Sequence, residues 1–178
     1  MSGYVIEFQN VNMVFGKKAI LKDVSFTVSK GETLAVIGPS GSGKSTILRL
    51  LIGLLEPTEG KILINGQDVS QFDEDHWNVL RQKMGMVFQY SALFDFLNVG
   101  ENVAFGLRQH TELSEAEIQK IVAERLEQVG LPGTQAAYPA ELSGGMKKRV
   151  SLARATALQP GIVLYDEPTA GLDPIMSE

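Results

Sequence analysis

A glycine-rich loop between an apolar segment and a helical pattern limits the fold of this chain more than any other feature. Residues 38–45 read GPSGSGKS and satisfy the pattern G-x-x-x-x-G-K-[ST] in full. Residues 33–37, before the loop, are nearly all apolar and predict a strand buried on both faces. Residues 45–55, after it, carry apolar side chains at helical spacing. The order of strand, turn and helix predicts an α/β protein.

The loop predicts a binding site for Mg·ATP. Its glycines allow successive backbone N–H groups to converge on phosphate oxygens at a helix N-terminus. Lys44 adds a mobile positive charge for the β- and γ-phosphates, and the Ser45 hydroxyl is placed to bind Mg²⁺. The residues that we predict to contact the nucleotide are Gly38, Pro39, Ser40, Gly41, Ser42, Gly43, Lys44, Ser45 and Thr46.

Further segments are typical of an α/β core. Strand-type residues or period-two alternation predict strands at residues 5–8, 11–15, 24–28, 61–64, 84–88 and 162–165. Residues 73–83 predict a helix. We therefore predict a core with a mixed or parallel sheet, whose N-terminal portion is antiparallel.

The middle of the chain differs in character from the core. Residues 89–142 show helices and loops and no convincing strand. Ser114 followed by Glu117 is a capping box, which predicts the start of a helix, and Gly130 ends that helix. Apolar residues between these two positions mark one face of the helix, so we expect it to pack against neighbouring helices.

These segments predict one domain with a helical insertion. A second helix begins at Ser143 and extends to about residue 158. We predict a single domain over residues 1–178. Its α/β core comprises residues 1–88 and 159–178, and its helical subdomain comprises residues 89–158.

Two carboxylates follow the apolar segment that predicts the last strand. At the C-terminal end of a parallel strand the chain faces the crevice where open α/β sheets bind ligands. Successive residues point to opposite faces, so Asp166 and Glu167 can have different roles. Asp166 suits a water-mediated contact to Mg²⁺, and Glu167 suits the positioning and polarisation of an attacking water.

Composition disfavours several classes of protein. The formal net charge of −5 gives no hint of a basic face, so we expect no nucleic-acid partner. The absence of cysteine excludes disulfides and cysteine-based metal sites. No apolar run is long enough to cross a membrane, and the N-terminus shows no leader pattern. We therefore expect a cytoplasmic protein that does not insert into the membrane.

Residues 142–146, LSGGM, resemble the signature motif LSGGQ of the ABC (ATP-binding cassette) ATPases. The order of the other motifs resembles that family too. Gln89 stands at the place of the Q-loop, the Walker B strand ends at Glu167, and residues 171–173 stand at the place of the D-loop. Phe15 lies where the family places an aromatic residue that stacks on adenine.

The resemblance implies a role for each matching residue. Catalysis would depend on Glu167, Lys44 and Gln89, and the ligands of Mg²⁺ would be Ser45, Gln89 and Asp166. A second anion site would form at the helix start made by Ser143, Gly144 and Gly145. The resemblance implies that this site closes on the ATP of a second, identical subunit, head to tail, so that the homodimer buries two nucleotides.

Met146 departs from the usual glutamine of the signature and cannot hydrogen-bond as an amide does. Together with residues 91–94 (SALF) and 173–175 (DPI), it makes the chain similar to the ATPases of Mce-type lipid transporters, which serve systems that maintain lipid asymmetry. This resemblance implies a motor subunit at the inner face of the cell membrane. It would dock on integral-membrane permease subunits and couple ATP hydrolysis to phospholipid or lipid transport.

Several alternatives remain open. The chain could serve a nutrient importer, for example for amino acids, or act as a soluble ABC ATPase in DNA repair or translation, or bind ATP without hydrolysis. Residues 90–103, with Phe94 and Phe96, would receive a permease helix or simply fill the core of the helical subdomain. The substrate and the direction of transport are set by partners that the sequence does not contain.

The sequence stops at Glu178, where ABC ATPases ordinarily continue, and contains no counterpart of the family's switch histidine. We therefore expect a C-terminally incomplete domain. Strands at residues 33–37 and 162–165 would face a gap with unpaired backbone groups, which is costly in a buried sheet. Residues 1–178 alone should show negligible ATPase activity.

Overall fold

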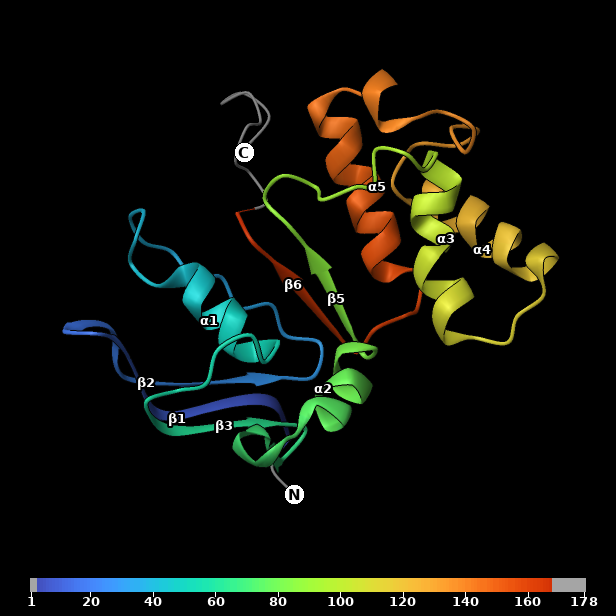
Figure 1. Cartoon of the computed structure of the whole chain (residues 1–178). Coiled ribbons are helices and arrows are strands. Elements are labelled where there is room, and N and C mark those ends of the chain that lie inside the picture. The colour runs from blue at the N-terminus through green and yellow to red at the C-terminus, as the bar shows by residue number, and fades with distance from the viewer. Residues whose placement is uncertain (1–2, 168–178) are drawn as a thin grey trace. The chain divides into compact units, whose positions relative to one another are not determined.

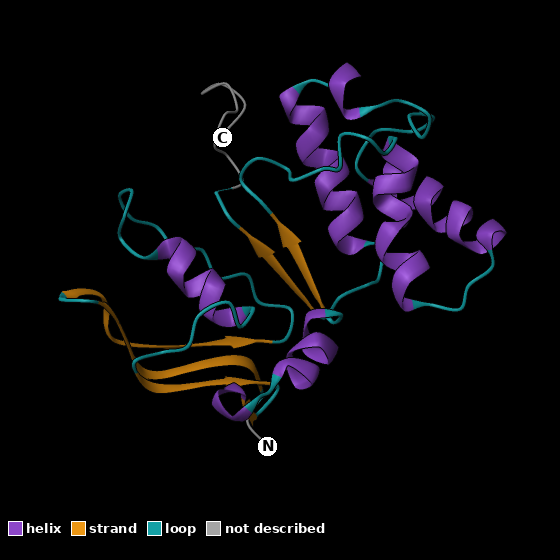
Figure 2. Ribbon diagram, viewed as in Figure 1, coloured by secondary structure: helices purple, strands orange, loops and turns teal. Residues whose placement is uncertain are grey.

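Alternating apolar and polar residues near the N-terminus form a four-stranded antiparallel sheet (Figures 1 and 2). The strands occur in the order β2-β1-β3-β4 in a computed structural model that describes residues 3–167. Their bounds are β1 (Tyr4–Phe15), β2 (Lys18–Ser29), β3 (Glu59–Ile64) and β4 (Gln67–Asp68). The predicted strands at residues 5–8, 11–15, 24–28 and 61–64 are confirmed, and the first two are one continuous strand.

The chain divides into two compact units, Met1–Val79 and Leu80–Glu178. In the first unit, α1 (Lys44–Leu51) lies over one face of the sheet (Figure 1). Its residues Leu50 and Leu51 are buried, and Leu50 lines the same small pocket as Ile62 of β3. Burial of these side chains holds the helix that follows the glycine-rich loop against the sheet.

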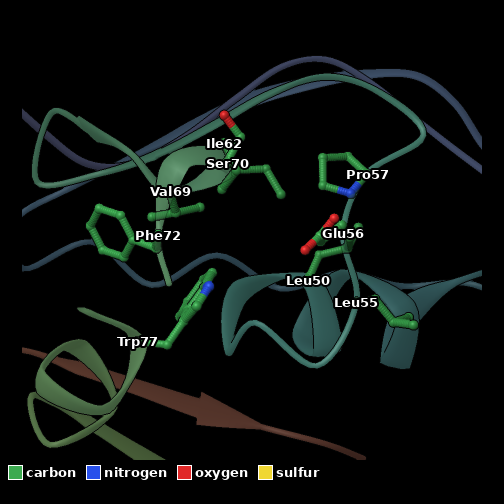
Figure 3. Close-up of a pocket in the computed structure, with 9 residues that line it drawn as sticks. All are labelled: Leu50, Leu55, Glu56, Pro57, Ile62, Val69, Ser70, Phe72 and Trp77. Carbon is green, nitrogen blue, oxygen red and sulfur yellow. The ribbon is translucent and has the colours of Figure 1, made fainter. Parts of the chain in front are cut away.

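A small pocket lies between α1, β3 and the start of α2 (Glu74–Arg81), next to the 3₁₀ turn η1 (Val69–Gln71) (Figure 3). Its cavity volume is about 20 Å³, and its walls include Leu50, Ile62 and Trp77. A volume of this size holds about one water molecule. The pocket therefore cannot hold a nucleotide.

Two predictions for this unit need correction. Residues 33–37, predicted to be a strand buried on both faces, form neither strand nor helix, and Ile37 is 93% exposed. A strand exists only when a neighbour accepts its backbone hydrogen bonds, and no described strand pairs with this segment. The helix after the loop was predicted to reach residue 55 but ends at Leu51. It ends because Gly53 adopts a left-handed φ of 69°, which stops a helix.

The second unit contains a parallel pair of strands. β5 (Met84–Val87) pairs with β6 (Ile162–Tyr165), with Met84 opposite Ile162 and Val87 opposite Tyr165. Parallel strands require a long crossover connection, and here the helical region supplies it. Because the strands run in the same direction, the residues that follow them emerge at the same edge of the pair.

Three helices form the core of the second unit: α3 (Val99–His110), α4 (Glu115–Gln128) and α5 (Gly144–Thr156). A short 3₁₀ turn, η2 (Pro139–Glu141), precedes α5. One contiguous cluster joins the apolar faces of the three helices, and its fully buried members include Val103, Val122 and Val150. Burying these faces in water-free contact is the main source of stability for such a bundle.

Hydrogen bonds across the first turn fix where two of these helices begin. Ser114 and Glu117 form the predicted capping box at α4, with the Ser114 N–H donating to Glu117 Oε2 at 2.8 Å. A second capping box, between Asn98 and Glu101, starts α3 and was not singled out in the sequence. No helix of the described residues 3–167 is long and apolar enough to cross a membrane.

Candidate functional site

The glycine-rich loop adopts a turn that ends directly in the first turn of α1. The Ser42 N–H donates to Pro39 O at 3.2 Å, which closes the turn. Gly43, the last residue before the helix, has a φ of 101°, a conformation that residues with a Cβ atom rarely adopt. The loop therefore leads directly into a helix N-terminus, where the first backbone N–H groups of a helix can bind an anion.

Close packing fixes the end of the loop on the sheet. A Cβ atom at Gly43 would lie 2.8 Å from Leu21 Cδ2 and 3.3 Å from Ile20 Cγ2, both on β2. The 2.8 Å distance is shorter than real Cβ contacts, so a side chain at Gly43 would require Leu21 to shift. The sheet thus sets the place of the loop as well as its conformation.

The Lys44 side chain lies over the loop that precedes it. Its ammonium donates to Gly38 O at 2.9 Å and to Pro39 O at 3.2 Å. These carbonyls hold the positive charge against the first two residues of the glycine-rich loop. The Ser45 hydroxyl belongs to the next position of the same first helical turn. The loop residues predicted to bind phosphates and Ser45 are therefore all placed in one short segment of the first unit.

Gln89 and Glu167 meet in the second unit, as the parallel strands bring their ends to the same edge. Gln89 follows β5 by two residues, Glu167 follows β6 by two, and Gln89 Nε2 donates to Glu167 Oε2 at 2.9 Å. The Asp166 N–H donates to Val87 O at 2.9 Å and extends the pairing of the strands. Glu167 itself has a left-handed φ of 49°, a costly conformation that often marks a functional position.

The signature segment forms the start of α5. Ser143 is the N-cap residue, and its hydroxyl oxygen accepts a hydrogen bond from the Met146 N–H at 3.3 Å. Cβ atoms at Gly144 or Gly145 would meet no atom within 4 Å, so the approach to this helix start is open. The Met146 side chain is half-buried against the helical cluster. Methionine therefore serves packing here, while the backbone and Ser143 present the hydrogen-bonding groups.

Phe15 ends β1, opposite Lys18 across the first hairpin, and is 46% exposed. An exposed aromatic face at this position can stack on a planar ring, and its role as the adenine contact stays a prediction. Residues 171–173, predicted to be the D-loop, lie outside the described residues. The loop and Phe15 belong to the first unit, and the remaining predicted site residues belong to the second.

The oxygen-rich donor set suits Mg²⁺. Ser45 offers a hydroxyl, Gln89 an amide oxygen and Asp166 a carboxylate, and magnesium prefers oxygen ligands of these kinds. The hydrogen bond to Glu167 uses the nitrogen of the Gln89 amide and not its oxygen. The residues present therefore fit the predicted cation, although their coordination of it stays a prediction.

Two residues that hold the segment after Gln89 were not found from the sequence. Asn102 is fully buried, its Oδ1 accepts from the Phe94 N–H at 2.9 Å, and its Nδ2 donates to Phe94 O at 3.1 Å. Arg154 of α5 donates to the backbone of the same segment. Asn102 could have been found, because it is an amide on the apolar face of α3 and a buried polar group needs hydrogen-bond partners.

Comparison with known proteins identifies the family. The family model described as ABC transporter matches residues 21–170, which is most of the chain. This range includes the glycine-rich loop, Gln89, the signature and both carboxylates.

Three curated relatives align with nearly the whole chain. The chloroplastic protein TRIGALACTOSYLDIACYLGLYCEROL 3 of Arabidopsis thaliana is 48% identical over 99% of this chain and 53% of its own length. The probable ribonucleotide transport ATP-binding protein mkl of Mycobacterium leprae is 46% identical over 97% of this chain and 50% of its own. The intermembrane phospholipid transport system ATP-binding protein MlaF of Haemophilus influenzae is 45% identical over 98% of this chain and 66% of its own length. The chain spans about half the length of the first two.

A solved structure has the same fold. The ATP-binding cassette MJ0796, in a dimeric post-hydrolysis state bound to ADP and Pi, matches with a TM-score of 0.85 and 35% sequence identity. The match covers 96% of this chain and 77% of that one. The predicted α/β architecture with an antiparallel N-terminal portion is thereby confirmed. The family model, the order of the motifs and the shared fold agree, and the chain belongs to the ABC transporter family.

Proposed function

We propose that this chain binds and hydrolyses ATP as the motor subunit of a membrane transporter. The observation that carries the proposal is the 2.9 Å hydrogen bond between Gln89 and Glu167 at the ends of two parallel strands. The two side chains that it joins are the ones we propose as the base and as a magnesium ligand, and their contact supports a shared role in hydrolysis. The glycine-rich loop that leads into the start of α1 supports the same conclusion.

Each residue contributes a different part of the chemistry. The loop N–H groups and Lys44 bind the phosphates and stabilise the charge that develops on them. Ser45, Gln89 and Asp166 would hold Mg²⁺, which when bound would supply positive charge against the phosphates. Glu167 accepts a hydrogen bond from the attacking water, whose oxygen forms a bond to the γ-phosphorus while the bond to the bridging oxygen breaks. The products are ADP and inorganic phosphate.

Dimerisation would complete the site. The N-cap Ser143 and the open helix start beside it form a second place where N–H groups can bind an anion. The solved dimer of the cassette MJ0796 with ADP and Pi shows that a related chain pairs in a nucleotide-bound state. We propose that two copies of this chain pair head to tail, so that each Ser143 contacts the nucleotide of the partner.

The names of the relatives support lipid as the transported class. MlaF is named for intermembrane phospholipid transport, and the Arabidopsis relative carries the name of a glycolipid. We propose that this subunit works at the inner face of a cell membrane, bound to permease subunits. The mycobacterial relative is named for ribonucleotide transport, so ribonucleotide is the second candidate substrate. Tyr90 and Phe96, 87% and 77% exposed, form the surface that we propose faces a permease.

The test of hydrolysis compares Glu167→Gln with Glu127→Gln in the full-length protein. Glu127 is exposed on α4, a helix that contributes no predicted site residue, and its change removes the same charge. We expect Glu167→Gln to bind ATP normally but to lose about 100-fold or more in turnover. Its ATP complex should accumulate as a dimer, which light scattering detects. Turnover equal to that of Glu127→Gln would refute the role of Glu167.

The test of substrate uses the subunit together with the membrane proteins encoded beside its gene. Vesicles containing the complex receive either fluorescent phospholipid or labelled ribonucleotide, with ATP and Mg²⁺. ATP-dependent movement of the phospholipid supports the proposal, and movement of the ribonucleotide alone replaces it with the second candidate. Glu167→Gln serves as the inactive control in both arms.

A further inference from the structure

The segment after Gln89 is fixed by an arginine from a different part of the chain. Arg154, in the last turn of α5, donates from Nη1 to Ala92 O at 2.8 Å and from Nη2 to Ser91 O at 3.1 Å. One planar guanidinium thus binds two successive carbonyls, which fixes the direction of the backbone as well as its position. Ser91 follows Gln89 by only two residues.

The backbone that Arg154 binds is strained. Ser91 and Ala92 have φ values of 62° and 47°, so two successive residues with Cβ atoms adopt the left-handed conformation. Such residues persist in that conformation only where the surroundings hold them there, and they gather at functional sites. Without the two hydrogen bonds from Arg154, this turn would relax toward ordinary backbone angles, and Gln89 beside it would move.

A ring contact and burial strengthen the clamp. The guanidinium carbon of Arg154 lies 5.7 Å from the centre of the Phe94 ring, a cation–π contact. Phe94 is itself packed against Phe105, with ring centres 4.8 Å apart. Burial lowers the pKa of Arg154, yet an arginine remains charged at neutral pH. Within residues 3–167 the structure shows no salt bridge from Arg154 to a carboxylate. The groups that interact with its positive charge are the carbonyls of Ser91 and Ala92 and the ring of Phe94.

The other end of the segment is fixed as well. The fully buried Asn102 accepts a hydrogen bond from the Phe94 N–H and donates one to Phe94 O. Its Nδ2 also donates to Leu97 O at 3.0 Å. The chain from residue 91 to residue 97 therefore cannot drift as a free loop. Motion at Gln89 depends on the turn at Ser91 and Ala92, which is the part that Arg154 binds.

We infer that Arg154 is a positioning residue that holds Gln89 against Glu167, through the strained turn at Ser91 and Ala92. It acts by fixing the backbone from which Gln89 extends, because its guanidinium binds the carbonyls of Ser91 and Ala92. The inference rests on the proposed function, because a correctly placed Gln89 matters for hydrolysis only if Gln89 and Glu167 form the site.

A second arginine on the same helix provides a matched control. Arg149 Nη1 donates to Val129 O at 3.3 Å and to Gly130 O at 3.2 Å, so it also binds two successive carbonyls. Its target is the end of α4 and not the segment after Gln89. Arg154→Met and Arg149→Met each keep a long apolar stem and remove one guanidinium.

The first experiment measures ATP turnover, ATP affinity and thermal stability of both variants in the full-length protein. We expect Arg154→Met to lower kcat by about 10- to 100-fold, the usual effect of losing a residue that orients a ligand. Its ATP affinity should persist, because the loop before α1 is unchanged, and it should need more Mg²⁺ for half-maximal activity. Arg149→Met should keep both kcat and the Mg²⁺ requirement. Equal kcat in the two variants, or losses of kcat that only follow losses of thermal stability, would overturn the inference.

The second experiment does not depend on turnover. The NMR resonance of the Gln89 side-chain amide should shift in Arg154→Met toward that of an exposed glutamine, and stay in place in Arg149→Met. If the wild-type protein does not hydrolyse ATP, the proposed function fails, and this shift alone decides whether Arg154 positions Gln89. If Arg154→Met does not fold, Arg154→Lys replaces it, because lysine keeps the charge but lacks the planar guanidinium that binds both carbonyls at once. An unmoved Gln89 resonance in that variant would refute the inference.

Discussion

Replacing Gly43 by alanine should destabilise the first unit by two additive effects. The backbone at Gly43 has a φ of 101°, and holding a residue with a Cβ atom in left-handed backbone costs about 1–2 kcal/mol. The added methyl group would lie 2.8 Å from Leu21 Cδ2, and Leu21 is buried in the sheet and has little room to move. Forcing an extra group into packed surroundings costs about 1–3 kcal/mol. The expected loss in the free energy of unfolding is therefore about 2–5 kcal/mol.

A neighbouring glycine separates the two effects. Gly41 has a φ of 80°, but a Cβ atom there would meet nothing within 4 Å. Gly41→Ala should therefore lose only the backbone contribution of about 1–2 kcal/mol. Urea unfolding followed by tryptophan fluorescence measures both variants, because Trp77 is the only tryptophan and is buried in the first unit. Equal losses for Gly43→Ala and Gly41→Ala would show that the sheet does not constrain the loop as described.

Three further changes test separate parts of the molecule. Lys44→Ala should weaken ATP binding by about 10- to 100-fold in calorimetry, since the loop loses a charged donor, and near-normal affinity would contradict its assignment. Met146→Gln should keep most ATP turnover, because the Met146 side chain serves packing. Ser143→Arg should abolish turnover, because the larger side chain would fill the space at the start of α5. Equal turnover in the two variants would refute the account of the signature. Arg108→Leu should raise the pKa of Glu115 from about 2 toward 4.5 in an NMR titration, since the guanidinium hydrogen bonds are lost; an unchanged value would contradict that cause.

Features set by residues close in sequence were predictable. The capping box of Ser114 and Glu117 and the N-cap Ser143 were found because each depends on a hydrogen bond between residues three positions apart. The loop before α1 was found because its glycines and Lys44 follow a fixed spacing. The start of α3 at Asn98 uses the same kind of signal and could have been found in the same way.

Features set by distant partners were not predictable from one sequence. Residues 33–37 have the composition of a buried strand, but composition does not supply a neighbouring strand, and the segment remains outside the sheet. Gln89 and Glu167 were each assigned to the site, but their direct hydrogen bond joins residues 78 positions apart. The link between Arg154 and Ala92 spans 62 positions and follows no local pattern. Such contacts arise from the packing of whole elements.

One helix carries both a proposed dimer contact and the clamp on Gln89. Ser143 caps the start of α5, and Arg154 lies in its last turn. An α-helix rises about 1.5 Å per residue and is stiff over three to four turns, so its two ends keep a fixed distance and orientation. The apolar face between them, with Val150 and Ala153 fully buried, fixes the helix within the helical cluster. A shift of this helix therefore moves the signature and the turn at Ser91 together. The placement of Gln89 against Glu167 consequently depends on the same packed face that presents Ser143.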